Sequence, residues 1–136
     1  MSQRYLFPPT NIAKHELESG SLFSPVFNES GLITCVIFDA LSKDVLMVAY
    51  MNAEALSKTL ESGEAWYWSR SRKELWHKGE TSGQIQTIKT IKVDCDQDSL
   101  LIEVIVQGDG GCCHTGNHTC FFRTLDIASD GKIKLR

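Results

Sequence analysis

Several features are missing from the sequence, and each absence excludes a class of protein. No stretch approaches the roughly 20 consecutive apolar residues that span a bilayer, and the first residues lack the apolar core of a secretory signal. The net charge of −3 provides no general basic field for a polyanion, so binding to bulk nucleic acid is not expected. We therefore expect a cytoplasmic globular protein that has neither a membrane nor a nucleic acid as its partner.

The five cysteines also lack the pattern of a disulfide framework. Their number is odd, and Cys112 directly precedes Cys113, an arrangement that suits paired disulfides poorly. The C-x2-C pairs that usually build closed structural zinc sites are absent as well. Reduced thiols are expected, each packing as a small hydrophobe or binding a metal. Cys35, inside a β-rich run, is expected to lie in the core.

The composition and length fit one domain. A chain of 136 residues with 42% hydrophobic residues can bury one core, and no linker divides it. We expect an irregular N-terminal arm of unclear role over residues 1–30 and a single domain over residues 31–136. The predicted fold class is α+β, mainly β, with a twisted antiparallel sheet or partial barrel and one main helix.

Local patterns place these elements along the chain. Runs of β-branched and aromatic residues predict strands, and Asp130-Gly131 is a late turn signal. Asn52 and Gly63 are placed to cap and end the one main helix, with Leu56 and Leu60 four residues apart on one face. The predicted strands cover residues 32–38, 45–50, 65–69, 85–93, 100–106 and 119–124. Residues 100–106 are nearly all apolar, which predicts a central strand covered on both faces.

Potential metal ligands gather on both sides of this central strand. Before it, Asp94, Asp96 and Asp98 alternate around Cys95, so the three carboxylates can share one face and hold a hard cation. An acidic surface turn is the alternative, although a cysteine is rarely left in such a turn. After the strand, three thiols and two imidazoles occur within nine residues, 112–120. These are donors that Zn²⁺ prefers, in a structural knot or in an open site that activates water.

The histidines of the second cluster are candidates for proton transfer. His114 is adjacent to a cysteine of the cluster, and its side chain titrates near neutral pH, so it is our candidate general acid or base. A weaker form of the same argument applies to His118.

A local basic cluster occurs between residues 66 and 83 in an otherwise acidic protein. Its cations and hydroxyls are donor types that bind phosphate groups, and a small phosphorylated ligand fits them better than a polymer. The alternative is that the aromatic residues of this stretch pack in the core and the arginines are solvated. The candidate ligand-binding residues are Ser69, Arg70, Ser71, Arg72, Lys78, Thr81 and Ser82.

Taken together, these stretches resemble the phosphoribosyl-AMP cyclohydrolase family, which acts at the third step of histidine biosynthesis. The matching segments are SRSRKELWHKGETSG at 69–83, DCDQD at 94–98 and CHTGNHTCF at 113–121, in the expected order. The resemblance implies Zn²⁺ on Cys95, Cys113 and Cys120, and Mg²⁺ on Asp94, Asp96 and Asp98. It also implies an intertwined homodimer whose zinc ligands come from both subunits. Cys112 stands where a small residue is common, which leaves open which neighbouring thiol binds the metal.

The resemblance further implies a substrate and a reaction. The substrate is phosphoribosyl-AMP, and zinc-activated water is expected to attack C6 of its adenine ring, breaking the N1–C6 bond. The product is the formimino aminoimidazole carboxamide ribotide, and His114 is our candidate for moving the proton. Some family members carry a fused pyrophosphohydrolase domain, whose activity we do not expect in a chain that stops at Arg136.

Two other functions compete with this hypothesis. In a zinc-stabilised binding module, the metal would only hold the fold. In a zinc deaminase of another nucleotide, H-x-E and P-C-x-x-C motifs would be expected, and the sequence has neither.

Overall fold

The computed structural model describes residue 7 and residues 13–136. Much of the predicted arm over residues 1–30 therefore lies outside the described residues. The described elements, in chain order, are α1 (Lys14–Ser19), β1 (Ile33–Asp39), β2 (Val45–Met51), α2 (Ala53–Ser62), β3 (Trp66–Ser69), β4 (Glu74–His77), β5 (Gln86–Val93), β6 (Ser99–Val106), β7 (Leu125–Ile127) and β8 (Ile133–Leu135). The fold is mainly β, as predicted. No described helix is long and apolar enough to cross a membrane.

The main sheet is mixed rather than antiparallel, and its strand order is β2-β1-β6-β5. Two antiparallel hairpins, β1–β2 and β5–β6, are joined because β1 runs parallel to β6, with Thr34 opposite Ser99. The prediction of an antiparallel sheet was correct for the two hairpins and wrong for the pairing of β1 with β6, which is parallel. Local turn signals specify hairpin pairing, whereas pairing between distant hairpins has no local signal. Among the described residues the sheet stays open, so the predicted partial barrel is not formed.

The main helix, α2, follows its sequence signals closely. The Asn52 side chain accepts a hydrogen bond of 2.8 Å from the backbone N–H of Ala55, and Gly63 ends the helix with φ of 76°. The buried face includes Leu56 and Thr59, whereas Leu60, which we expected beside Leu56, is 36% exposed. The Thr59 hydroxyl instead binds the backbone of Trp66, which ties the helix to β3.

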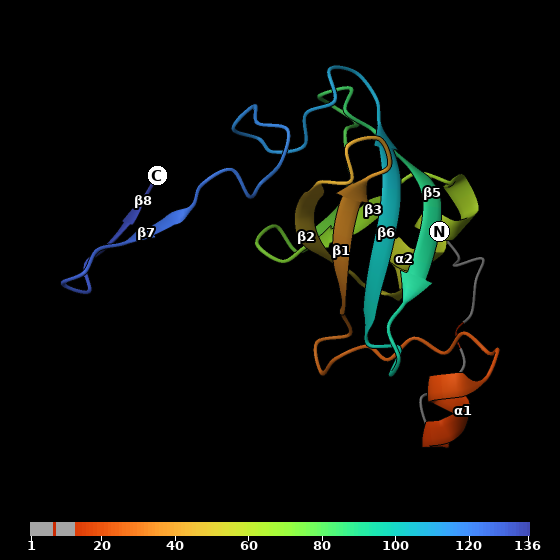
Figure 1. The fold of residues 1–136 in the computed structure, drawn as a ribbon. Coiled ribbons are helices and arrows are strands. Elements are labelled where there is room, and N and C mark those ends of the chain that lie inside the picture. The colour runs from red at the N-terminus through yellow and green to blue at the C-terminus, as the bar shows by residue number, and fades with distance from the viewer. Residues whose placement is uncertain (1–6, 8–12) are drawn as a thin grey trace.

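Other described elements of the chain cover one face of the main sheet and leave residues of the other face exposed. Helix α2 and the β3–β4 hairpin lie behind the sheet in Figure 1 and cover the face that contains Ile33, Ile37 and Ile102. On the opposite face, called here the outer face, Leu101 and Ile105 of β6 are each 39% exposed. The prediction that this strand is covered on both faces was therefore wrong for the isolated chain.

Four elements were missed by the sequence prediction. Helix α1 has no side-chain cap and no buried residue, so neither a capping residue nor a buried apolar face indicated it in the sequence. Strand β4 lies in a stretch where charged residues interrupt the aromatic ones. Residues 119–124, predicted to be extended, contain no strand, and the last two strands, β7 and β8, instead flank the predicted turn at Asp130-Gly131.

Candidate functional site

The two clusters of potential ligands lie at opposite ends of β6. The turn between β5 and β6 carries Asp94 to Asp98, and the loop that follows β6 carries Cys112 to Cys120. Because β6 has eight residues, it separates the two clusters by about 25 Å at roughly 3.3 Å per residue. Within one chain, Cys95 therefore lies far from Cys113 and Cys120.

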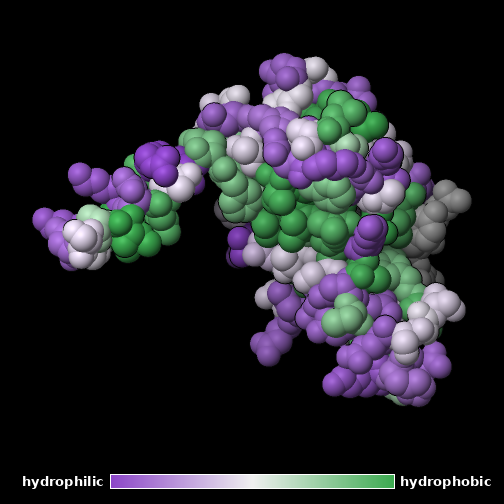
Figure 2. Space-filling view, in the orientation of Figure 1, coloured by the Kyte–Doolittle hydropathy of each residue, from purple (hydrophilic) through white to green (hydrophobic). Residues whose placement is uncertain are grey.

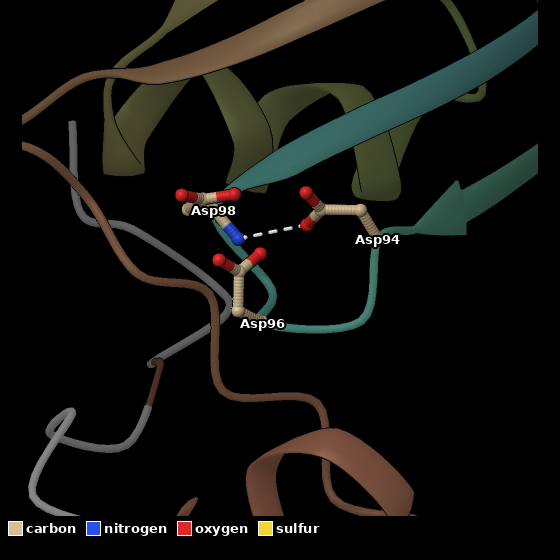
Figure 3. A group of neighbouring side chains, drawn as sticks. All are labelled: Asp94, Asp96 and Asp98. Carbon is tan, nitrogen blue, oxygen red and sulfur yellow. Dashed lines mark hydrogen bonds between the residues drawn. The ribbon is translucent and has the colours of Figure 1, made fainter.

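The structure brings the three aspartates together. Potential ligand oxygens of Asp94, Asp96 and Asp98 all lie within 4.8 Å of one another, and all three residues are exposed (Figure 3). The Oδ1 atom of Asp94 accepts hydrogen bonds of 3.0 Å from the backbone N–H groups of Asp98 and Ser99. Gln97 adopts φ of 60°, and this left-handed residue lets the turn curl so that the carboxylates face one another.

The proximity of these carboxylates changes their proton affinity. Hydrogen bonds with Asp96 and Asp94 raise the pKa of Asp98 from 3.8 to about 6. Partial burial acts to raise the pKa of Asp94, but hydrogen bonds from Asp98 and Ser99 outweigh it and lower that pKa. The cluster thus holds a proton more tightly than an isolated aspartate does, a sign that it concentrates negative charge.

Gln97 fastens the carboxylate turn to the N-terminal segment. Its side chain is buried, and its amide nitrogen donates to the carbonyls of Leu17 and Leu22 at 2.8 and 3.1 Å. Its amide oxygen accepts from the N–H of Ser24 at 2.8 Å. The described part of the predicted arm is therefore attached to the turn that carries the candidate metal ligands, a connection that the sequence analysis missed.

At the other end of β6, two of the three predicted zinc ligands are neighbours. The Cys113 and Cys120 thiols share a hydrogen bond. Hydrogen bonds from the side chain and backbone of Thr115 lower the pKa of Cys113, which favours the thiolate form that binds metals. Burial is the largest cause of the raised pKa of Cys120.

The other two cysteines of the chain are buried in the interior. Burial raises the pKa of Cys35 to about 12, and the residue lies in the core as predicted. Burial likewise raises the pKa of Cys112 to about 12, and its sulfur lies 3.9 Å from the Leu46 carbonyl. A protonated, buried Cys112 fits packing better than metal ligation, in line with our preference for Cys113 as the ligand.

Lys78 occupies an unexpected place beside the thiols. The residue is 7% exposed, and its ammonium donates a hydrogen bond of 2.6 Å to the Cys112 carbonyl. Its nitrogen also lies 5.3 Å from the centre of the Trp76 ring. Its positive charge acts to lower the pKa of Cys113 and of Cys120. Lys78 therefore supports the loop that carries the thiols.

A cavity of about 600 Å³ opens beside the two thiols. Cys113, Cys120 and the exposed His114 line it, together with Lys78 and three other predicted ligand-binding residues, Arg72, Thr81 and Ser82. The cavity thus combines two thiols, an imidazole and donors for an anion.

The remaining predicted ligand-binding residues line a second cavity of about 680 Å³. Ser69, Arg70 and Ser71 belong to it, and the Arg70 guanidinium lies 4.0 Å from the centre of the Tyr50 ring. Both cavities are lined by Met47, Trp76 and Cys120. Donors for anions therefore lie on both sides of the thiols, and the predicted basic cluster is divided between two adjoining hollows.

Two histidines act as anchors around these cavities. His118 lies in a separate small hollow, with Nε2 3.4 Å from Asp39 and 3.6 Å from Asp44. His77 lines the larger thiol cavity, stacks on Trp66 at 4.5 Å and binds Glu64 at 2.9 Å. Trp76 and His77 were not predicted to belong to the site, although the alternating residues of β4 are a signal that could have placed them.

Comparison with known proteins finds one matching family and closely similar relatives. The sequence model of the family described as phosphoribosyl-AMP cyclohydrolase matches residues 47–122. Proteins named phosphoribosyl-AMP cyclohydrolase from Chelativorans sp. (strain BNC1) and Rhodopseudomonas palustris (strain BisA53) are both 54% identical to this chain. The alignments cover 93% and 90% of this chain, and 90% and 83% of those relatives. A protein of the same name from Brucella canis is 52% identical, over 96% of this chain and 93% of its own length.

Proposed function

Because this chain belongs to the phosphoribosyl-AMP cyclohydrolase family of histidine biosynthesis, we propose that it hydrolyses the N1–C6 bond of phosphoribosyl-AMP in a zinc-dependent reaction. The observation that carries the proposal is the pair of thiols, Cys113 and Cys120, on the wall of a cavity that also presents cationic and hydroxyl donors. A cytoplasmic location is part of the same proposal.

The donor set at this wall suits zinc. Cys113 has a lowered pKa and shares a hydrogen bond with Cys120, so the two sulfurs are placed to bind one soft or borderline cation. A zinc ion held by three thiolates leaves a fourth position for water and makes that water a stronger acid. Cys95 is the third ligand in our proposal.

Cys95 must then come from a second copy of the chain. About 25 Å of β6 separates it from the other two thiols in its own chain. A two-fold dimer in which the β6 strands run in opposite directions brings the Cys95 end of each copy to the Cys113 end of the other. We therefore propose a homodimer with two equivalent sites, each with ligands from both chains.

The chain's own side chains bind the substrate and move a proton. His114 is exposed at the cavity wall and protonates N1 as the N1–C6 bond breaks, while the water oxygen becomes the carboxamide oxygen at C6. The substrate carries two phosphates, and donors lie in two adjoining cavities. We assign one phosphate to Arg72, Thr81 and Ser82, and the other to Arg70, Ser69 and Ser71.

The aspartate turn is the proposed magnesium site. Its oxygens are close enough to share a cation, and carboxylates are the ligands that Mg²⁺ prefers. When bound, Mg²⁺ supplies positive charge near Cys95, which lies in the same turn as the aspartates. In the proposed dimer this turn would lie at the partner's cavity, and a cation held by Asp94, Asp96 and Asp98 would supply positive charge for a substrate phosphate there.

Subunit complementation tests the shared site. Cys95→Ser and Cys113→Ser proteins are each expected to lack ring-opening activity and to bind less zinc. When equal amounts are unfolded together and refolded, half of the dimers are mixed and each has one intact site, so about a quarter of wild-type activity should return. The ultraviolet change on ring opening measures the activity.

A matched control mixes two variants that each lack one proposed ligand from the loop after β6. Mixing Cys113→Ser with Cys120→Ser leaves no intact pair of thiols in any dimer, and no activity should return. Normal zinc content and turnover of the Cys95→Ser protein alone, or equal recovery in both mixtures, would overturn the proposed shared site.

A further inference from the structure

The last residues of the chain form a hairpin that stands apart from the rest of the molecule. Among the described residues, strands β7 and β8 pair with each other and with no other strand, and Figure 1 shows them extending away from the main sheet. Every residue from 121 to 136 is exposed. The backbones of the two strands are hydrogen-bonded to each other, with Thr124 and Arg136 exchanging two hydrogen bonds of 2.9 Å. Isolated two-stranded hairpins are at best marginally stable in water, so this one needs a surface to pack on.

The two faces of the hairpin differ sharply. Leu125 lies opposite Leu135, and Ile127 lies opposite Ile133, while Asp126 faces Lys134 between them. Because side chains alternate along a strand, the four aliphatic residues share one face and the charged pair lies on the other. The aliphatic side chains are 55% to 68% exposed. The apolar face is therefore an unsatisfied packing surface.

The outer face of the main sheet offers a matching apolar surface. Val48 is 43% exposed, and Leu101 and Ile105 are each 39% exposed. Figure 2 shows hydrophobic residues gathered over this part of the sheet. No described element of the same chain covers these residues. One chain thus carries two uncovered apolar surfaces, one on the hairpin and one on the sheet.

The hairpin and the rest of the chain have net charges of opposite sign. Residues 121–136 contain four Lys or Arg and two Asp or Glu, which gives a net charge of +2. Residues 1–120 carry the remaining net charge of −5. A basic hairpin is attracted to an acidic body, and its opposite sign distinguishes it from the rest of the chain.

We propose that the β7–β8 hairpin is an exchanged arm, which packs its apolar face on the outer sheet face of a second copy of this chain. Cys120 donates its backbone N–H to the Leu46 carbonyl at 2.7 Å, so the arm leaves the body immediately after the last proposed zinc ligand. Exchange in both directions gives a closed two-fold dimer. The proposed shared zinc site also requires a second copy of the chain. In this respect the inference rests on the proposed function.

Charged substitutions on the apolar face of the arm test this contact in the full-length chain. The wild-type protein is expected to have twice the chain mass of 15.2 kDa by light scattering, measured without added zinc or substrate. Leu125→Asp with Ile133→Asp should shift the mass to that of one chain, with an unchanged circular dichroism spectrum. The control, Asp126→Asn with Lys134→Gln, alters the other face of the same strands, keeps the net charge and should remain dimeric.

A cross-linking measurement identifies the surface that the arm contacts. A photoreactive benzoylphenylalanine at position 127, in a mixture of ordinary and isotope-labelled chains, should link to peptides of a differently labelled chain that contain Leu101 or Ile105. The proposed contact would be overturned if the double aspartate variant remained dimeric. Cross-links within one chain only, or cross-links between two arms, would also overturn it. The shared zinc site could still stand in those cases, since subunit complementation tests it separately. A wild-type protein with the mass of one chain would overturn both.

Discussion

The Lys78 ammonium donates a hydrogen bond of 2.6 Å to the carbonyl of Cys112 from an almost fully buried position. Lys78 follows the last residue of β4, and Cys112 opens the loop with the proposed zinc ligands. The contact therefore joins two walls of the thiol cavity that are 34 residues apart in sequence. Lys78 was predicted to bind substrate, and this contact adds a positioning role beside the thiols.

Replacement of Lys78 by methionine should destabilise the protein and loosen the thiol loop. The substitution keeps much of the side chain's volume but leaves the Cys112 carbonyl without its buried donor, which costs about 1–3 kcal/mol. We expect a lower unfolding temperature and faster loss of zinc to a chelator. Lys73→Met, in the exposed turn between β3 and β4, should change neither quantity. Equal zinc release from both variants would contradict the positioning role.

Replacement of Gln97 by alanine should release the N-terminal segment from the carboxylate turn. The substitution removes three hydrogen bonds and leaves the carbonyls of Leu17 and Leu22 without this donor. A loss of about 1–3 kcal/mol in the free energy of unfolding is expected, and hydrogen exchange should increase in residues 17–26. The matched control is Gln107→Ala, an exposed glutamine just beyond the other end of β6, which should change stability by less than about 0.5 kcal/mol.

Binding of Mg²⁺ to the aspartate turn should depend on pH near 6. The pKa of Asp98 is raised to about 6 by its hydrogen bonds with Asp96 and Asp94, so the cluster keeps a proton below that pH. A cation must displace this proton, and the affinity should therefore fall as the pH drops through about 6 and level off above it. Calorimetry in buffers of different ionisation enthalpy measures the released proton. Proton release that is unchanged in Asp98→Asn would contradict this assignment.

Removal of zinc by a chelator should abolish ring opening and leave the main sheet folded. The core consists of aliphatic residues, Tyr67 and two buried cysteines, none of them a proposed zinc ligand. The proposed ligands Cys95 and Cys120 are exposed at the ends of the sheet. Circular dichroism and activity, followed together, separate an open catalytic site from a zinc-stabilised binding module. Cooperative unfolding on chelation would favour the binding module.

The sequence predicted those elements whose signals are local. The Asn52 cap and the Gly63 stop of α2 were correct because both act within one helical turn. The approach of Asp94, Asp96 and Asp98 was likewise predicted from their alternation, but the structure achieves it with a turn and not with an extended segment. The turn itself requires the left-handed Gln97, for which there was no residue-type signal, since glutamine rarely adopts that conformation.

The features that were missed depend on distant parts of the chain. The parallel contact of β1 with β6 and the hydrogen bond between Lys78 and Cys112 both join segments far apart in sequence. A single sequence offers no period or motif for such contacts. The expectation that β6 is covered on both faces came from its apolar composition. That composition indicates that Leu101 and Ile105 are suited to burial, without identifying which chain supplies the cover.

The parallel pairing of β1 with β6 also affects how the chain acquires its structure during synthesis. Thr34 pairs with Ser99, 65 positions later, so the β1–β2 hairpin emerges from the ribosome well before the strand that completes its sheet. Until β6 is made, β1 presents an unpaired edge to its surroundings. Such long-range pairing slows folding, and this interval is when the nascent chain is most exposed to aggregation and most dependent on chaperones.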